Sequence, residues 1–228
     1  MKKLVLAIMI SMAAVPVMLA NQVTVEGAPG GYGPYQTGGG GEFTFKPDAG
    51  LSYVLNSYEG LAKNQGVSGT FQSFCVEDRE IIYPNTTLNV VLNDHSVYSG
   101  QTLSVGAAWL YAQFATGQLA GYDHSAAKIG DLQNSIWMLM HENIDSRNAV
   151  YNHTYYDLAV STFGSSGVFA ADNGAHHVAV MNLWDGTPNT QGNQRQDMLI
   201  YGVPDGGTTC ALLGMALTGL GLARRKML

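Results

Sequence analysis

The stretch FQSFCVED, residues 71–78, contains the side chain best suited to chemistry, the thiol of Cys75. A cysteine thiolate is a strong nucleophile. The only other cysteine, Cys210, lies close to the C-terminus, so Cys75 is alone in the main part of the chain. A free cysteine also packs as a small hydrophobe. A reduced core cysteine is therefore the alternative to a reactive one.

The N-terminus has the layout of a secretory signal peptide. Lys2 and Lys3 form a basic start, and an apolar run from Leu4 to Val15 follows. Small residues then lead to Ala20, where cleavage is expected. We therefore predict that residues 1–20 are a signal peptide and that the protein is exported.

The C-terminus combines a turn, an apolar run and a basic end. The turn is Val203–Gly207, the apolar run is Thr208–Ala223, and Arg224, Arg225 and Lys226 follow directly. Positive charge beside an apolar helix marks its cytoplasmic end. Sixteen residues are short for a span of about 20. This pattern predicts a short transmembrane helix and a transient membrane anchor.

The order of these features resembles the VPDSG variant of the PEP-CTERM sorting tails. Val203, Pro204, Asp205 and Gly207 fit the motif, and Gly206 stands where the family usually has serine. The resemblance covers residues 203–228. It implies recognition by an exosortase, a membrane-embedded peptidase, and delivery to the cell surface or the extracellular matrix. An ordinary C-terminal anchor is the alternative.

Composition places one acidic domain between these ends. Residues 21–202 contain six basic and sixteen acidic side chains, a net charge near −10, which argues against nucleic-acid binding. Residues 21–41 are rich in glycine and predict a flexible lead. Residues 42–202 have the size of a single domain.

Within that domain, alternating and helical patterns succeed one another. Strand-like alternation comes first, helical periodicity occupies the middle, and strands return at the end. This order predicts an α+β domain with strands at both ends and a central segment of two or three helices. Strands are expected in 42–47, 51–58, 67–78, 86–93, 167–172, 176–184 and 195–202, and helices in 104–118, 124–143 and 152–164.

Two of these segments together resemble the thioester domains of bacterial surface adhesins. The first carries Phe74-Cys75-Val76, and the second carries Gln133, Ser135, Ile136 and Trp137, with serine in place of the more usual alanine. The resemblance implies a bond between the Cys75 sulfur and the Gln133 side-chain carbonyl. The pocket around this bond is expected to include Phe74, Trp109, Ile136 and Trp137.

The implied chemistry is plausible on physical grounds. A carboxamide is a poor electrophile in water, but a thiol held against it reacts intramolecularly, with effective molarities of about 10⁵–10⁸ M. Ammonia leaves, and a target amine or hydroxyl later attacks the thioester. Such a site is a single-use covalent attachment device, not a turnover enzyme, and it needs no cofactor. His141 and Glu77 are candidates for the acid or base, although surface residues of these types more commonly have no such role.

Other sites have weaker support. His176 and His177 would face opposite sides of a strand, and no His-Glu-x-x-His pattern occurs, so we expect no metal site. Cys75 lies in a strand and lacks the signature of a papain-like enzyme. A secreted hydrolase is the weakest hypothesis. The preferred interpretation is an exported surface or matrix protein with a thioester, and the alternative is a non-covalent structural protein with a reduced Cys75.

Overall fold

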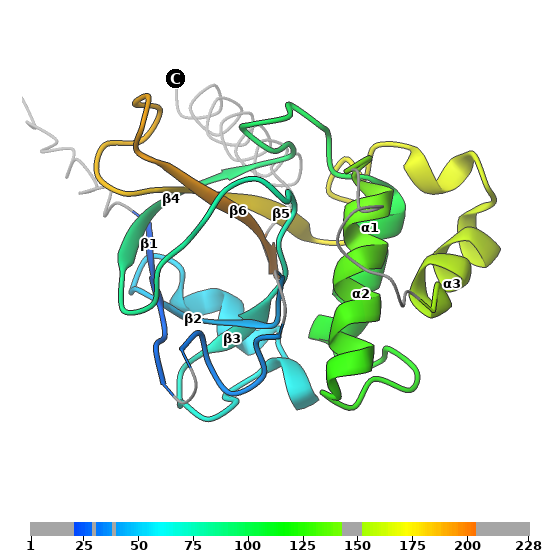
Figure 1. The fold of residues 1–228 in the computed structure, drawn as a ribbon, viewed down its shortest axis with the longest axis horizontal. Coiled ribbons are helices and arrows are strands. Elements are labelled where there is room, and N and C mark those ends of the chain that lie inside the picture. Colours follow the sequence, from blue (N-terminus) through cyan, green and yellow to red (C-terminus); the bar gives the residue numbers. More distant parts are fainter. Residues whose placement is uncertain (1–20, 29–30, 38–39, 143–151, 204–228) are drawn as a thin grey trace, which may run out of the picture.

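The computed structural model describes residues 21–28, 31–37, 40–142 and 152–203. Within these residues the chain forms a six-stranded antiparallel sheet and three α-helices (Figure 1). The predicted α+β class, with strands at both ends of the domain, is confirmed. The predicted signal peptide and the sorting tail from residue 204 onward lie outside the described residues.

The sheet has the strand order β3-β2-β1-β4-β5-β6, and all neighbouring strands run antiparallel. Its two edge strands come together, because the chain after β3 hydrogen-bonds to β6. The N–H of Val76 donates to the carbonyl of Asp197 at 2.9 Å, and the N–H of Leu199 donates to the carbonyl of Phe74 at 3.1 Å. The strands are β1 Gln22–Val25, β2 Phe43–Pro47, β3 Phe71–Ser73, β4 Thr87–Asn93, β5 Val178–Trp184 and β6 Gln194–Tyr201.

The first strand corrects the prediction that residues 21–41 are a flexible lead. β1 lies inside the sheet, between β2 and β4, and the side chains of Val23 and Val25 are fully buried. Four residues of alternating character are too few to dominate a glycine-rich composition. The two neighbouring strands supply the hydrogen bonds and the apolar surface that make this short segment a strand.

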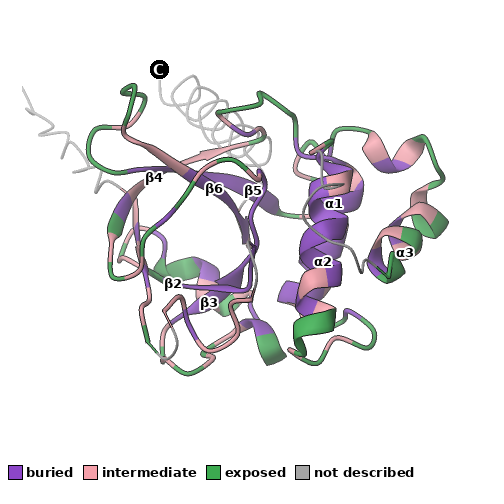
Figure 2. Ribbon diagram, viewed as in Figure 1, coloured by how far each residue is buried: buried purple, intermediate pink, exposed green. Residues whose placement is uncertain are grey.

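The helices cover one side of the sheet (Figure 1). They are α1 Val105–Ala115, α2 Ala126–Leu139 and α3 Thr154–Phe163, within the segments where helices are predicted. The Ser104 side chain caps α1 by accepting the N–H of Ala107 at 3.2 Å. α1 contacts β5 and β6, and α3 packs on the outer side of α1 and α2. Buried residues accordingly gather on the sheet, α1 and α2, whereas α3 is more exposed (Figure 2).

Two of the predicted strands are wrong. Residues 51–58 contain the 3₁₀ helix η1, Ser52–Asn56, and residues 167–172 contain the 3₁₀ helix η3, Gly167–Phe169. Leu51 and Val54 are both buried, at the three-residue spacing that matches a 3₁₀ turn. Short apolar runs of this kind fit either periodicity, so local sequence alone does not distinguish them.

Candidate functional site

Helix α2 lies along the chain segment that follows β3 and contacts it through two side chains. Gln133 Nε2 donates to the carbonyl oxygen of Cys75 at 2.8 Å, and Trp137 Nε1 donates to that of Glu77 at 3.0 Å. Four residues of α-helix rise about 6 Å, and two residues of extended chain span about 6.6 Å. The spacing Gln-x-x-x-Trp on the helix therefore matches Cys-x-Glu on the extended segment.

The amide oxygen of Gln133 sits between two backbone donors. It accepts the N–H of Gly41 at 2.8 Å and the N–H of Cys75 at 2.9 Å, and the residue is 2% exposed. Two backbone N–H groups aimed at one carbonyl oxygen form the arrangement of an oxyanion hole. Negative charge that develops on this oxygen would therefore be stabilised without reorganisation of the protein.

Cys75 is free and buried, at 2% exposed. Burial raises the pKa of this thiol well above its ordinary value, while hydrogen bonds from the backbone N–H groups of Gly41 and Cys75 lower that pKa by a smaller amount. Cys75 and the Gln133 amide thus lie against each other in the protein interior. The fold brings together the two residues that the sequence predicts as partners, across 58 positions of chain.

Gly40 and Gly41 allow the backbone to approach this amide. A Cβ atom on Gly40 would lie 2.4 Å from Gln133 Cγ, and one on Gly41 would lie 2.8 Å from Phe74 Cδ1. Such distances leave no room for a side chain. Sequence reasoning missed these two residues because it treated the glycine run as a spacer. The signal that was present is glycine directly before a strand, which often marks a close approach of backbone.

Three of the four residues expected to form the pocket around Cys75 and Gln133 are buried, and the fourth, Trp109, packs elsewhere. Phe74, Ile136 and Trp137 are each 2% exposed or less. The Phe74 ring lies edge-on to Phe114, with 5.1 Å between ring centroids. Trp109 is half-buried, and its ring contacts Phe163 of α3 at 5.8 Å between centroids. Trp109 therefore contributes to the packing between helices α1 and α3.

The expected acid–base residues have other contacts. Glu77 is 1% exposed, and its Oε1 accepts the N–H of Ser99 at 2.7 Å, so this carboxylate holds a loop. The helix expected in 124–143 ends at Leu139, so His141 lies beyond α2. The backbone of His141 is left-handed, with φ of 60°, and its exposed ring stacks on Phe169.

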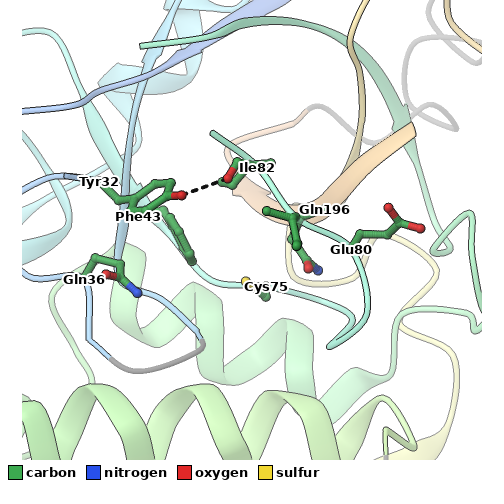
Figure 3. Close-up of a pocket in the computed structure, with 8 residues that line it drawn as sticks. Tyr32, Gln36, Phe43, Cys75, Glu80, Ile82 and Gln196 are labelled. Atoms are coloured by element: carbon green, nitrogen blue, oxygen red, sulfur yellow. Dashed lines mark hydrogen bonds between the residues drawn. The ribbon is translucent and has the colours of Figure 1, made fainter. Parts of the chain in front are cut away.

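A cavity of about 170 Å³ leads to Cys75 (Figure 3). On one side of this cavity, the Tyr32 hydroxyl donates a hydrogen bond of 3.0 Å to the carbonyl of Ile82. Burial and the nearby Glu77 raise the pKa of Glu80. None of the described lining residues carries positive charge: they are Tyr32, Gln36, Phe43, Cys75, Glu80, Ile81, Ile82 and Gln196. The pattern of the sequence alone gave no indication that Tyr32, Gln36, Glu80 or Gln196 lie near Cys75.

Among the described residues, no group of three or more His, Cys, Asp or Glu side chains is placed to hold a metal ion. No described helix has both the length and the apolar character needed to cross a bilayer. The predicted transmembrane helix, 208–223, lies outside the described residues.

Comparison with known proteins bears on the C-terminus. Searches of curated proteins and of solved structures found no match. Residues 202–227 match the VPDSG-CTERM motif. The chain therefore carries a VPDSG-CTERM sorting signal, which supports export, processing by an exosortase-type membrane peptidase and a final location at the cell surface or outside the cell.

Proposed function

We propose that this exported protein attaches covalently to a target through an internal thioester between Cys75 Sγ and Gln133 Cδ. One observation supports this most strongly: the Gln133 amide is fixed against the residue that carries the thiol. Its oxygen accepts the N–H groups of Gly41 and Cys75, and its Nε2 donates to the Cys75 carbonyl.

Formation of the thioester is a balanced acyl transfer. The sulfur attacks Cδ, the S–C bond forms, the C–N bond breaks, and the thiol proton leaves with the nitrogen as ammonia. The charge that develops on Oε1 is stabilised by the two N–H donors, and loss of one such donor typically costs about 3 kcal/mol of transition-state stabilisation. The hydrogen bond from Nε2 to the Cys75 carbonyl fixes the plane of the amide during the attack.

When the thioester reacts with a target, the Cys75 sulfur, which was the nucleophile, becomes the leaving group. An amine or hydroxyl of the target enters through the cavity beside Cys75 and attacks Cδ. The target becomes bonded to Gln133, and Cys75 becomes a free thiol again. Because Glu80 lines this cavity, it replaces His141 and Glu77 as the first candidate to accept the proton of the attacking group. Burial of Cys75 and Gln133 keeps bulk water from the thioester beforehand.

A second candidate function is a non-covalent surface or matrix protein with a reduced Cys75. The observation in its favour is that the Gln133 amide uses its oxygen and one N–H to bind the backbone of Cys75. These bonds attach α2 to the segment after β3, and this structural role would by itself explain why the glutamine is buried.

Intact mass separates the two functions. The thioester predicts that the purified protein is lighter than its calculated mass by one ammonia, and that Cys75→Ala and Gln133→Ala have their full calculated masses. Gln113→Ala, on helix α1, is the matched control and should keep the deficit. Methylamine should add to the wild-type protein and release one thiol. A full calculated mass in folded wild-type protein would overturn the thioester and leave Cys75 reduced, as the second candidate requires.

A further inference from the structure

The chain segment that supplies the Gly41 N–H is held by its neighbours. Gly40 and Gly41 have no side chains, and the space where those side chains would lie is filled by Gln133, Trp137 and Phe74. The position of the N–H must therefore depend on residues on either side. Gln36 contributes one hydrogen bond of 3.2 Å, from its Nε2 to the Gly40 carbonyl.

On the C-terminal side, Glu42 is fixed inside the protein. It is fully buried, and its Oε2 accepts hydrogen bonds from the Tyr122 hydroxyl and from His124 Nδ1, the latter at 2.8 Å. Burial raises the pKa of Glu42, and the contacts with His124 and Tyr122 lower it in part. A buried carboxyl group requires such partners, because its desolvation is otherwise unfavourable.

On the N-terminal side, the same histidine contacts Tyr35. The two rings are stacked, with 3.9 Å between their centroids and 8° between their planes. The His124 side chain is 7% exposed. His124 therefore contacts residues on both sides of the two glycines, Tyr35 by stacking and Glu42 by hydrogen bonding.

Resting on the thioester proposed above, we propose that His124 is a positioning residue for its formation. Through Glu42 and Tyr35, it holds the Gly41 N–H against Gln133 Oε1. Loss of the histidine leaves Glu42 with fewer partners, and the adjoining glycines have no side-chain contacts of their own to keep the N–H aligned. The oxyanion donor is then displaced, although helix α2 and Cys75 keep their positions.

Two substitutions separate the hydrogen bond of His124 to Glu42 from its stacking on Tyr35. His124→Phe keeps an aromatic ring against Tyr35 but removes the Nδ1 donor, whereas His124→Asn retains a donor near that position. Newly synthesised full-length protein of each variant, which still carries the Gln133 amide, is denatured and then refolded while the released ammonia is measured. A parallel sample, in which the thioester has been hydrolysed to a carboxylate, serves as the reference. Rates are divided by the folded fraction from circular dichroism. His124→Phe should slow ammonia release about tenfold or more, and His124→Asn should recover most of the rate.

The fold provides a matched control in a second histidine–carboxylate pair. His176 Nδ1 lies 2.5 Å from Oδ1 of the buried Asp172, and its ring contacts Phe163. His176→Phe should leave the normalised rate unchanged. A wild-type rate in His124→Phe, or an equal loss in His176→Phe, overturns the positioning role. Failure of the proposed function looks different, because wild-type protein would then release no ammonia.

A separate observation concerns the start of the sorting motif, which the folded domain holds. The N–H groups of Gly202 and Val203 donate to the carbonyl of His177 at 2.9 and 3.3 Å. Gly202 has φ of 83°, and a Cβ there would lie 2.6 Å from Ser57 Oγ. Val203 packs against the hydrophobic core. The match to the motif begins at Gly202, so its first two residues are part of the domain.

We infer that this docking slows processing by the exosortase-type peptidase. Peptidases act on locally opened chain, and cleavage follows the population of the open form when opening is fast. Insertion of Gly-Ser-Gly between Gly202 and Val203 should raise the rate of processing in cells about fivefold, the factor that one net hydrogen bond supplies. The same insertion after Gly192, in the loop between β5 and β6, is the control. An unchanged or lower rate with the first insertion overturns the inference.

Discussion

The side chain of Gln133 forms hydrogen bonds with both the N–H and the carbonyl of Cys75, at 2.9 and 2.8 Å. This pairing joins helix α2 to the segment that also hydrogen-bonds to β6. It therefore lies where the helices meet the sheet. Formation of the thioester removes the Nε2 donor with the leaving ammonia, so the full pairing belongs to the protein that keeps its amide.

In a Cys75→Ala background, which forms no thioester and keeps the Gln133 amide, replacement of Gln133 by glutamate should destabilise the domain. The carboxylate cannot donate to the Cys75 carbonyl, and it places a buried charge beside that oxygen. We expect a loss of about 3 kcal/mol in the free energy of unfolding at pH 8, and a smaller loss at pH 5, where the carboxyl group can be protonated and donate. Urea denaturation at the two pH values measures this. Equal losses at both would contradict the role of the Nε2 donor.

Two glycine substitutions should have opposite effects. Gly40→Ala should cost about 1–3 kcal/mol, because its Cβ would overlap Gln133 Cγ. Gly130→Ala, inside helix α2, should stabilise by about 0.5–1 kcal/mol, because no atom lies within 4 Å of the added Cβ and alanine favours the helix. Thermal melts of both variants test the pair. A neutral Gly40→Ala would show that the segment moves aside freely.

The stability of the domain should depend on the ionisation of Asp197. Burial raises the pKa of this fully buried residue to about 7, and its Oδ2 accepts the N–H of Val97 at 2.6 Å. Its pKa in the unfolded chain is about 4, so the folded state binds more protons between those values. This contribution is fully present below pH 4 and is lost as the pH rises through 7, by up to about 1.4 kcal/mol per pH unit.

Asp197→Asn should remove this dependence, because the amide oxygen still accepts the Val97 N–H but does not ionise. Denaturation curves for both proteins, collected from pH 4 to pH 8, give the comparison. Between pH 4 and 7 the wild-type free energy of unfolding should fall more steeply with pH than that of the variant. Parallel pH profiles would refute the assignment.

Deletion of residues 203–228 should change where the protein is found. The deletion removes nearly all of the matched motif, so the exosortase-type peptidase has no recognition sequence. The shortened protein should be released or mislocalised, as judged by fractionation of cells and medium. A chain with Arg224, Arg225 and Lys226 replaced by alanine tests the basic end separately. Normal surface delivery of the deletion would contradict the sorting role.

The sequence determined those features that depend on neighbouring residues. The sorting signal is a contiguous pattern of turn formers, apolar residues and terminal charge, and its match to a known motif confirms it. Helices α1, α2 and α3 were predicted correctly because helical periodicity repeats within a few residues. The α+β class followed from the order of such segments along the chain.

Tertiary structure decided what depends on distant partners. β1 became a strand because β2 and β4 flank it, and Gly41 became a donor to Gln133 although 92 positions separate the two. Helix α2 ends at Leu139, about one turn before the predicted end at residue 143, so His141 is not part of the helix. Local patterns record which residue types suit a helix or a strand, but close approach of backbone to side chain is set by packing between elements, which no short window of sequence contains.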